Sequence, residues 1–214
     1  MFPTRVLCLC ATVIGALLFA GCSDSPTLAP SALTSPAGTL AVKTAGPTYA
    51  DVSNQGGGGV YAANGASLLR RPNGLQVSLR MATPAPGGYN YPAGTVAGEP
   101  EVFTLWVFIF NNPELCSQPC DSNDLGVDKP ARGGAYNGAG HAVGGSVLSL
   151  SGRVGVGETP FNHPVITMAP LEKPATAEVH LAVAPHGALD PAKLPNEFRI
   201  PVGTPPFWWV ALFQ

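Results

Sequence analysis

The segment from residue 102 to residue 110, VFTLWVFIF, is the feature that most constrains how this chain can fold. Apolar side chains stand at both odd and even positions, so a strand built from this segment would be apolar on both faces. Its β-branched and aromatic residues favour a strand over a helix, and Asn111-Asn112-Pro113 ends the run. We therefore expect a central strand that is buried in the core.

Other segments alternate apolar and polar residues, which is typical of strands with one buried face. Such strands are expected at residues 75–81, 146–156, 165–168, 177–183 and 207–213. An Asn73-Gly74 pair marks a turn before the first of them, and residues 191–194 offer the only candidate for a helical turn. Strands separated by Gly- and Pro-rich loops predict one all-β domain, an antiparallel β-sandwich, over residues 59–214.

The composition limits the classes of partner. Charged residues make up 11% of the chain and the formal net charge is −2. No basic field is present that would hold nucleic acid, so no nucleic-acid partner is expected. Glycine and proline together account for 49 of the 214 residues, a share close to that of disordered chains, but the long apolar strands argue for a folded domain.

The first residues are typical of an export signal. Arg5 precedes an apolar run of 15 residues, 6–20, which is shorter than the roughly 20 residues that a transmembrane helix needs. A charged start, a short apolar core and small residues before a cleavage site indicate a removable signal peptide over residues 1–21.

The residues around the expected cleavage site resemble the lipobox of bacterial lipoproteins, in the sequence Phe19-Ala20-Gly21-Cys22. The resemblance implies cleavage before Cys22, a thioether to diacylglycerol on its thiol, and a fatty acid such as palmitate on the new amino terminus. Lipoboxes usually carry leucine where this chain has Phe19, and an ordinary secretory signal with an unmodified Cys22 is the alternative. Ser23 after the cysteine, by resemblance to known sorting behaviour, favours the outer membrane where two membranes exist.

A flexible tether is expected over residues 22–58, which are rich in Ser, Thr, Pro, Ala and Gly. Two cysteines, Cys116 and Cys120, remain in the domain of an exported chain, where disulfides persist. We expect them to pair and to stabilise a loop locally. A redox pair or half of a metal site are the alternatives, although the motif has three intervening residues and no second cysteine pair.

Two segments resemble a group of uncharacterised secreted bacterial β-rich proteins. One is the aromatic strand that ends in Asn111-Asn112-Pro113 before Cys116, and the other carries Glu178, His180 and the later His186-Gly187. The resemblance implies a shared fold but no particular chemistry.

Glu178 and His180 lie two residues apart on a predicted strand, so both should face the same, solvated side. Together with His186 they would suffice for a divalent metal, and His141 and His163 could join them through the fold. Alternatively, Glu178 and His180 are ordinary surface residues that pair with Arg80 or Arg153 across the sheet.

Three further groups carry possible binding chemistry. Tyr89 and Tyr91 offer aromatic platforms for a sugar ring or else pack structurally. Adjacent Trp208 and Trp209 on a strand should face opposite ways, so that one is in the core. The acidic loop with Asp121, Asp124 and Asp128 lacks the spacing of an EF-hand and is expected to be solvated, with calcium binding as the alternative.

No motif identifies an enzyme. The first hypothesis is therefore a lipid-anchored envelope module, without a cofactor, that binds an envelope protein or a carbohydrate or has a structural role. The second is a metal-dependent enzyme or redox protein that uses Glu178, His180 and His186.

Overall fold

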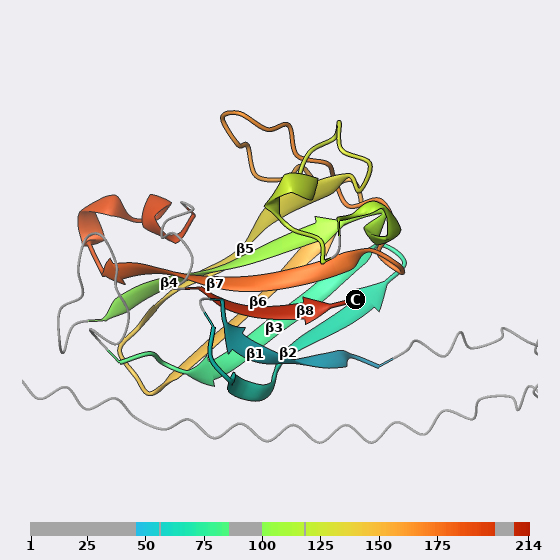
Figure 1. Cartoon of the computed structure of the whole chain (residues 1–214). Helices are drawn as coiled ribbons and strands as arrows, with labels where there is room; N and C mark the ends of the chain where they lie inside the picture. Colours follow the sequence, from blue (N-terminus) through green and yellow to red (C-terminus); the bar gives the residue numbers. More distant parts are fainter. Residues whose placement is uncertain (1–45, 56, 86–99, 118, 200–207) are drawn as a thin grey trace, which may run out of the picture. The chain divides into compact units, whose positions relative to one another are not determined.

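The computed structural model describes residues 46–55, 57–85, 100–117, 119–199 and 208–214. These residues form eight strands, β1 to β8, and four short 3₁₀ helices, η1 to η4 (Figure 1). The expected signal peptide, the lipobox with Cys22 and most of the expected tether lie outside the described residues. No helix among the described residues is long and apolar enough to cross a membrane.

All eight strands belong to one antiparallel sheet, in the order β5-β4-β7-β8-β1-β2-β3-β6. The strands are β1 Thr48–Asn54, β2 Val60–Arg71, β3 Gly74–Ala82, β4 Glu101–Phe110, β5 Gly133–Val143, β6 Val147–Gly155, β7 Glu178–Ala188 and β8 Trp209–Phe213. The helices are η1 Pro113–Leu115, η2 Ser122–Asp124, η3 Pro191–Lys193 and η4 Asn196–Phe198. The expected helical turn at residues 191–194 corresponds to η3.

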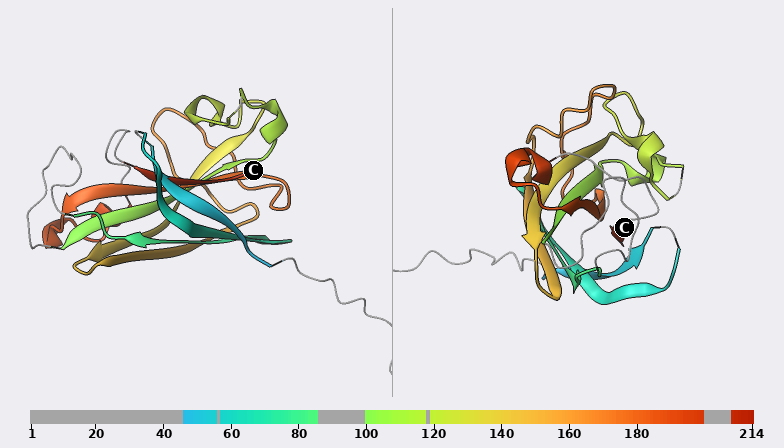
Figure 2. Two further views of the ribbon diagram at one scale, coloured as in Figure 1. Left: turned by 60° about the horizontal axis from the view of Figure 1, so that its bottom comes forward. Right: turned by 90° about the vertical axis from the view of Figure 1, so that its left-hand side faces the viewer.

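The sheet curls until it is nearly closed into a barrel, as the end-on view in Figure 2 shows. Its edge strands β5 and β6 approach each other at Gly138 and Gly152, where a Cβ on Gly152 would lie 2.6 Å from the Gly138 carbonyl oxygen. The all-β, antiparallel prediction is confirmed, but the predicted sandwich is not, because the strands form one sheet. Alternation shows only that each strand buries one face, and this is equally true of strands in a sandwich and in a barrel.

The inner face of the sheet encloses the main core, and β4 explains the apolar segment that the sequence singled out. Phe103, Leu105, Val107 and Ile109, at alternate positions of β4, face this core. Trp106 and Phe110 face outward, but loops that pack on the outside of the sheet bury them. The prediction of a central strand is therefore confirmed, since β4 lies between β5 and β7 and is covered on both faces.

Five of the six expected strands are confirmed, as β3, β4, β6, β7 and β8, and the predicted turn at Asn73-Gly74 joins β2 to β3. Residues 165–168 are irregular instead, because they pack as a loop on the outer face of β4 and β5. β1, β2 and β5 were not predicted. β1 lies inside the segment that was expected to be a tether, and it is ordered by pairing with β2 and β8.

The sequence of β5 shows no clear strand pattern, because four of its eleven residues are glycines. The structure shows why side chains are absent there. A Cβ on Gly134 would collide with the Ala169 carbonyl oxygen, and one on Gly140 would collide with Phe198. β5 has glycines at these positions because a loop and η4 pack directly on its backbone.

One side chain ties the loop between β6 and β7 to β5. The buried hydroxyl of Tyr136 on β5 donates a hydrogen bond to the Glu158 carbonyl oxygen, at 3.2 Å, and accepts one from the Leu171 N–H, at 2.7 Å. Burial raises the pKa of Tyr136 to about 12. This side chain therefore ties both ends of the loop, at Glu158 and at Leu171, to the sheet.

Candidate functional site

The structure brings Glu178 and His180 together on the outer face of β7. The Nε2 atom of His180 lies 2.6 Å from Oε1 of Glu178, and the two side chains are 14% and 3% exposed. The ring of His180 also packs on Phe110, with 5.1 Å between the ring centroids. This contact engages Nε2 of the ring and leaves Nδ1 as the ring nitrogen that does not face Glu178.

The expectation that both side chains face solvent is wrong for Glu178, which is buried. The alternative pairing with Arg80 or Arg153 is also wrong, because β7 lies between β4 and β8 whereas those arginines are on β3 and β6. A strand pattern shows which face of the sheet a side chain lies on but not whether that face is covered.

His186 is not close to this pair. It lies six residues farther along β7, which corresponds to roughly 20 Å on a strand, at a bulge where Val102 pairs with Gly187 and Phe103 with Pro185. In the part of the chain that the structure describes, no three His, Cys, Asp or Glu residues are grouped so that they could hold a metal ion. The proposed ligand set Glu178, His180 and His186 is thus not assembled.

The two other histidines also stand apart. His141 on β5 is exposed. His163 has a local structural role, because its Nδ1 accepts hydrogen bonds from the backbone N–H groups of Val165 and Ile166, at 3.2 and 3.1 Å.

Burial has a strong effect on the charge of His186. Its side chain is 4% exposed, and its Nε2 has no hydrogen-bond partner among the residues that the structure describes. Desolvation lowers the pKa of His186 from 6.5 to about 4. The folded state therefore holds this ring neutral at pH values where the unfolded chain protonates it.

We expect acid to destabilise the fold through His186. Its contribution is fully present above pH 6.5 and is lost as the pH falls towards 4, because only the unfolded state takes up the proton in that window. Between pH 7 and pH 5 the loss should be about 2 kcal/mol of unfolding free energy. Urea unfolding of the wild type and of His186→Gln at both pH values measures it.

The His186→Gln variant should lose about 2 kcal/mol less than the wild type over this pH range. The exposed His141 provides the control, since His141→Gln should leave the wild-type dependence unchanged. Equal pH dependence in the wild type and in His186→Gln would contradict the prediction.

The predicted disulfide is confirmed, with 2.08 Å between the sulfur atoms of Cys116 and Cys120. It stabilises the start of the acidic loop. Asp121 caps η2 by accepting a hydrogen bond from the Asn123 N–H at 2.7 Å, and Asp124 accepts one from the Asp121 N–H at 3.0 Å. Both carboxylates thus satisfy the backbone of their own loop, which differs from the ligand arrangement of a calcium site.

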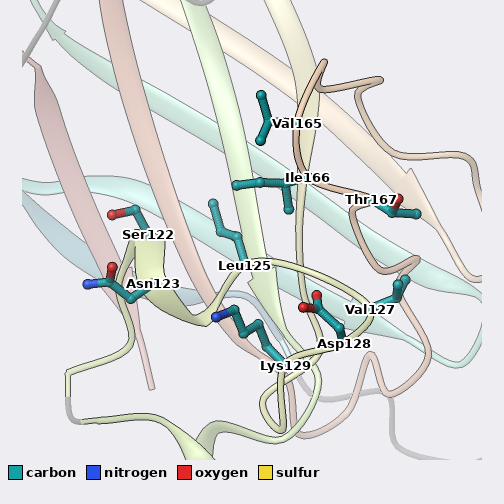
Figure 3. A pocket seen from close by; sticks show the side chains of 9 residues that line it. All are labelled: Ser122, Asn123, Leu125, Val127, Asp128, Lys129, Val165, Ile166 and Thr167. Carbon is teal, nitrogen blue, oxygen red and sulfur yellow. The ribbon is translucent and has the colours of Figure 1, made fainter.

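The same loop forms one wall of a hollow of about 420 Å³ (Figure 3). The other wall is the irregular segment that was predicted to be a short strand. The lining residues are Ser122, Asn123, Leu125, Val127, Asp128, Lys129, Val165, Ile166 and Thr167. This volume lies within the range of small-molecule sites, roughly 300–1,000 Å³.

The hollow has an apolar floor and a polar rim. Leu125 and Ile166 lie between the two walls in Figure 3 and belong to a cluster that packs on the outside of the sheet. A backbone hydrogen bond of 2.8 Å from Val127 N–H to the Thr167 carbonyl oxygen joins the walls. The rim carries hydroxyl, amide and charged groups together with the exposed Val165. The arrangement can therefore hold a ligand with both polar and apolar surface.

Of these lining residues, the sequence pointed only to Asp128, and it did so for a different reason. Lys129 and Thr167 lie 38 positions apart, and no motif or spacing connects them. The two walls meet through the backbone hydrogen bond from Val127 to Thr167 and through the packing of Leu125 and Ile166 on the same outer cluster. The hollow therefore depends on tertiary contacts.

The aromatic candidates differ in outcome. Tyr89 and Tyr91 lie outside the described residues, so their expected role stays a prediction. Trp208 and Trp209 face opposite ways as expected. Trp209 is in the core, and Trp208 is half-buried and stacks on Phe108 outside the sheet, with 6.3 Å between the ring centroids.

Comparison with known proteins gives no assignment, since no family model, no curated protein and no solved structure matches this chain.

Proposed function

We propose that this chain is an exported, lipid-anchored binding module of the bacterial envelope, and that the hollow between residues 122–129 and 165–167 holds a sugar unit of an envelope glycan. The observation that carries the proposal is the lining of this hollow, in which Leu125 and Ile166 form an apolar floor and the exposed rim is mostly polar.

A sugar ring presents hydroxyl groups around its edge and C–H groups on its faces. The hydroxyls of Ser122 and Thr167 and the amide of Asn123 offer donors and acceptors at the rim. Leu125 and Ile166 offer an apolar surface for a ring face. The disulfide and the capped η2 hold one wall in place before a ligand arrives, which lowers the entropic cost of binding.

Features outside the hollow support the envelope location. The lipobox-like Phe19-Ala20-Gly21-Cys22 and the short apolar run before it favour export and lipidation. The Cys116–Cys120 disulfide suits an oxidising compartment. A weakly charged domain at the end of a tether is compatible with presentation at a membrane surface, with the outer membrane favoured where two membranes exist.

Binding by the hollow is tested with soluble envelope saccharides and ligand-observed NMR. We expect Asn123→Ala and Thr167→Val each to weaken binding about 5- to 10-fold, since each removes one polar contact to the ligand. Ser149→Ala, on the exposed face of β6, is the matched control and should bind as the wild type does.

Three other outcomes are informative. Binding that is lost in Tyr89→Ala/Tyr91→Ala and kept in the hollow variants would move the sugar site to the two tyrosines. Binding of envelope peptides at the hollow would support the proposal of a binding module but would replace the sugar by a peptide as its ligand. Absence of any saccharide or peptide binding would refute the proposed function.

Lipid anchoring is tested separately. The wild type should incorporate radiolabelled palmitate. It should also sediment with membranes, because each buried methylene contributes about 0.8 kcal/mol and two or more acyl chains make anchoring stable. Cys22→Ala should incorporate none and remain in the soluble fraction. Equal labelling of both forms would rule out Cys22 as the attachment point.

A further inference from the structure

A second, much smaller pocket lies at the turn between β2 and β3, away from the hollow described above. Its volume is about 80 Å³. It is lined by Arg71, Asn73, Gly74, Leu75, Gln76 and Arg153, which come from the three neighbouring strands β2, β3 and β6 and from the turn (Figure 1). Pockets for drug-sized ligands are several times larger, so this one suits a small ion or a single headgroup.

The backbone fixes the positions of the two arginines. Arg71 pairs with Gly74 across the turn, and Gln76 lies directly opposite Arg153 on β6. The Val156 N–H donates a hydrogen bond of 3.1 Å to the Asn73 carbonyl oxygen, which ties the turn to the end of β6. Gly74 has a φ of +152° and a Cβ there would collide with the Val154 carbonyl oxygen, so the turn requires glycine.

Neither arginine forms an ion pair with any residue that the structure describes. Arg132, in contrast, pairs with Glu172. The nearby Glu158 carboxylate accepts a hydrogen bond of 2.7 Å from the Gly155 N–H instead. Two guanidinium groups that line one small pocket repel each other, and a bound anion would turn this repulsion into attraction.

We propose that this pocket binds a phosphate group. Guanidinium groups match the geometry of phosphate oxygens and form strong, charge-assisted hydrogen bonds with them. The side-chain amides of Asn73 and Gln76 supply further donors beside the two arginines. The pocket is large enough for one phosphate and too small for the rest of a nucleotide or a sugar phosphate, which would extend into solvent.

The phosphate can come from solution or from a phospholipid headgroup. β1 begins at Thr48, which pairs with Leu68 on β2 only three residues before Arg71. The first strand of the sheet therefore begins at the end of the sheet that carries the pocket. The headgroup source rests on the lipid anchoring proposed above, whereas phosphate binding itself does not.

Titration of the purified full-length Cys22→Ala chain with inorganic phosphate, followed by NMR chemical shifts, tests the site directly. We expect saturable shifts around residues 71–76 and 153, and about 10-fold weaker binding for Arg71→Gln and for Arg153→Gln. Arg80→Gln is the matched control, because Arg80 lies on β3 outside the pocket and its loss changes the net charge equally. Absence of saturable shifts, or an equal loss in Arg80→Gln, would overturn the proposal.

Sedimentation with vesicles identifies the source of the phosphate. If the ligand is a headgroup, the Cys22→Ala chain should bind phosphatidylglycerol vesicles over phosphatidylcholine vesicles, and Arg71→Gln should bind them less. If inorganic phosphate binds and vesicles do not, and if Arg71→Gln weakens phosphate binding, the phosphate site is supported and its ligand comes from solution. Two results would count against the site. One is vesicle binding by a chain that shows no saturable shifts with inorganic phosphate, and the other is vesicle binding that Arg71→Gln and Arg153→Gln leave unchanged.

Discussion

Asn111→Ala should lower the unfolding free energy by about 4 kcal/mol, which is among the largest effects expected of a single substitution. Asn111 is 1% exposed, and its amide makes four hydrogen bonds to backbone groups. Nδ2 donates to the carbonyl oxygens of Arg132 and Pro170, each at 2.9 Å. Oδ1 accepts from the N–H groups of Glu172 and Lys173, at 2.8 and 3.2 Å.

The alanine variant leaves these four part-buried backbone groups without the amide as their partner. Each unsatisfied buried group costs about 1–3 kcal/mol, and local relaxation recovers part of the sum. Urea unfolding at pH 7 with the disulfide intact measures the effect.

The neighbouring Asn112 gives a matched control for Asn111. Its side chain bonds to the Pro130 carbonyl oxygen and to Lys173, but in an exposed setting, so Asn112→Ala should cost less than about 1 kcal/mol. Similar losses of unfolding free energy in the two variants would show that the four hydrogen bonds of the Asn111 amide are not important for stability.

Gly152→Ala should destabilise the fold by about 3 kcal/mol, because it forces apart the two edges of the nearly closed sheet. The added Cβ would lie 2.6 Å from the Gly138 carbonyl oxygen and 2.9 Å from its carbonyl carbon. Both are backbone atoms, which cannot move aside as the end of a flexible side chain can, so the strands themselves must separate. Thermal or urea unfolding measures the loss, and faster hydrogen exchange in β5 and β6 should accompany it.

Gly145 in the loop between β5 and β6 provides the matched glycine control. No atom lies within 4 Å of a Cβ placed there, so Gly145→Ala should change the unfolding free energy by less than about 1 kcal/mol. If Gly152→Ala is equally neutral, the close approach of β5 and β6 is not important for stability.

The motif Asn111-Asn112-Pro113 illustrates what a sequence can and cannot convey. Its position after an aromatic strand correctly predicted the end of β4. The tertiary structure adds the reason why an asparagine is needed there, because residues about sixty positions later approach both sides of its amide. No local pattern contains that distant partner.

Glu178 and His180 show the same limit at the candidate site. Their spacing correctly placed both on one face of a strand, where they form a hydrogen bond. Burial of Glu178 is a tertiary property that the alternation does not reveal. The pair is separated from His186 because β7 continues as one extended strand through all three residues. The predicted ligand set therefore combined residues that the fold keeps apart.

The sequence alone determined the β class, five of the strands, the turn before β3, the disulfide and the opposite orientations of Trp208 and Trp209. These features are local, since they follow from alternation, turn residues and short separations along the chain. Only the tertiary structure decided the near-closure of the sheet and the strands β1, β2 and β5. It also decided the hollow and the placement of Arg71 and Arg153 around one pocket. The physical reason is that strand partners and loop contacts are chosen by packing between segments far apart in the chain, and glycine-rich strands such as β5 carry almost no side-chain pattern of their own.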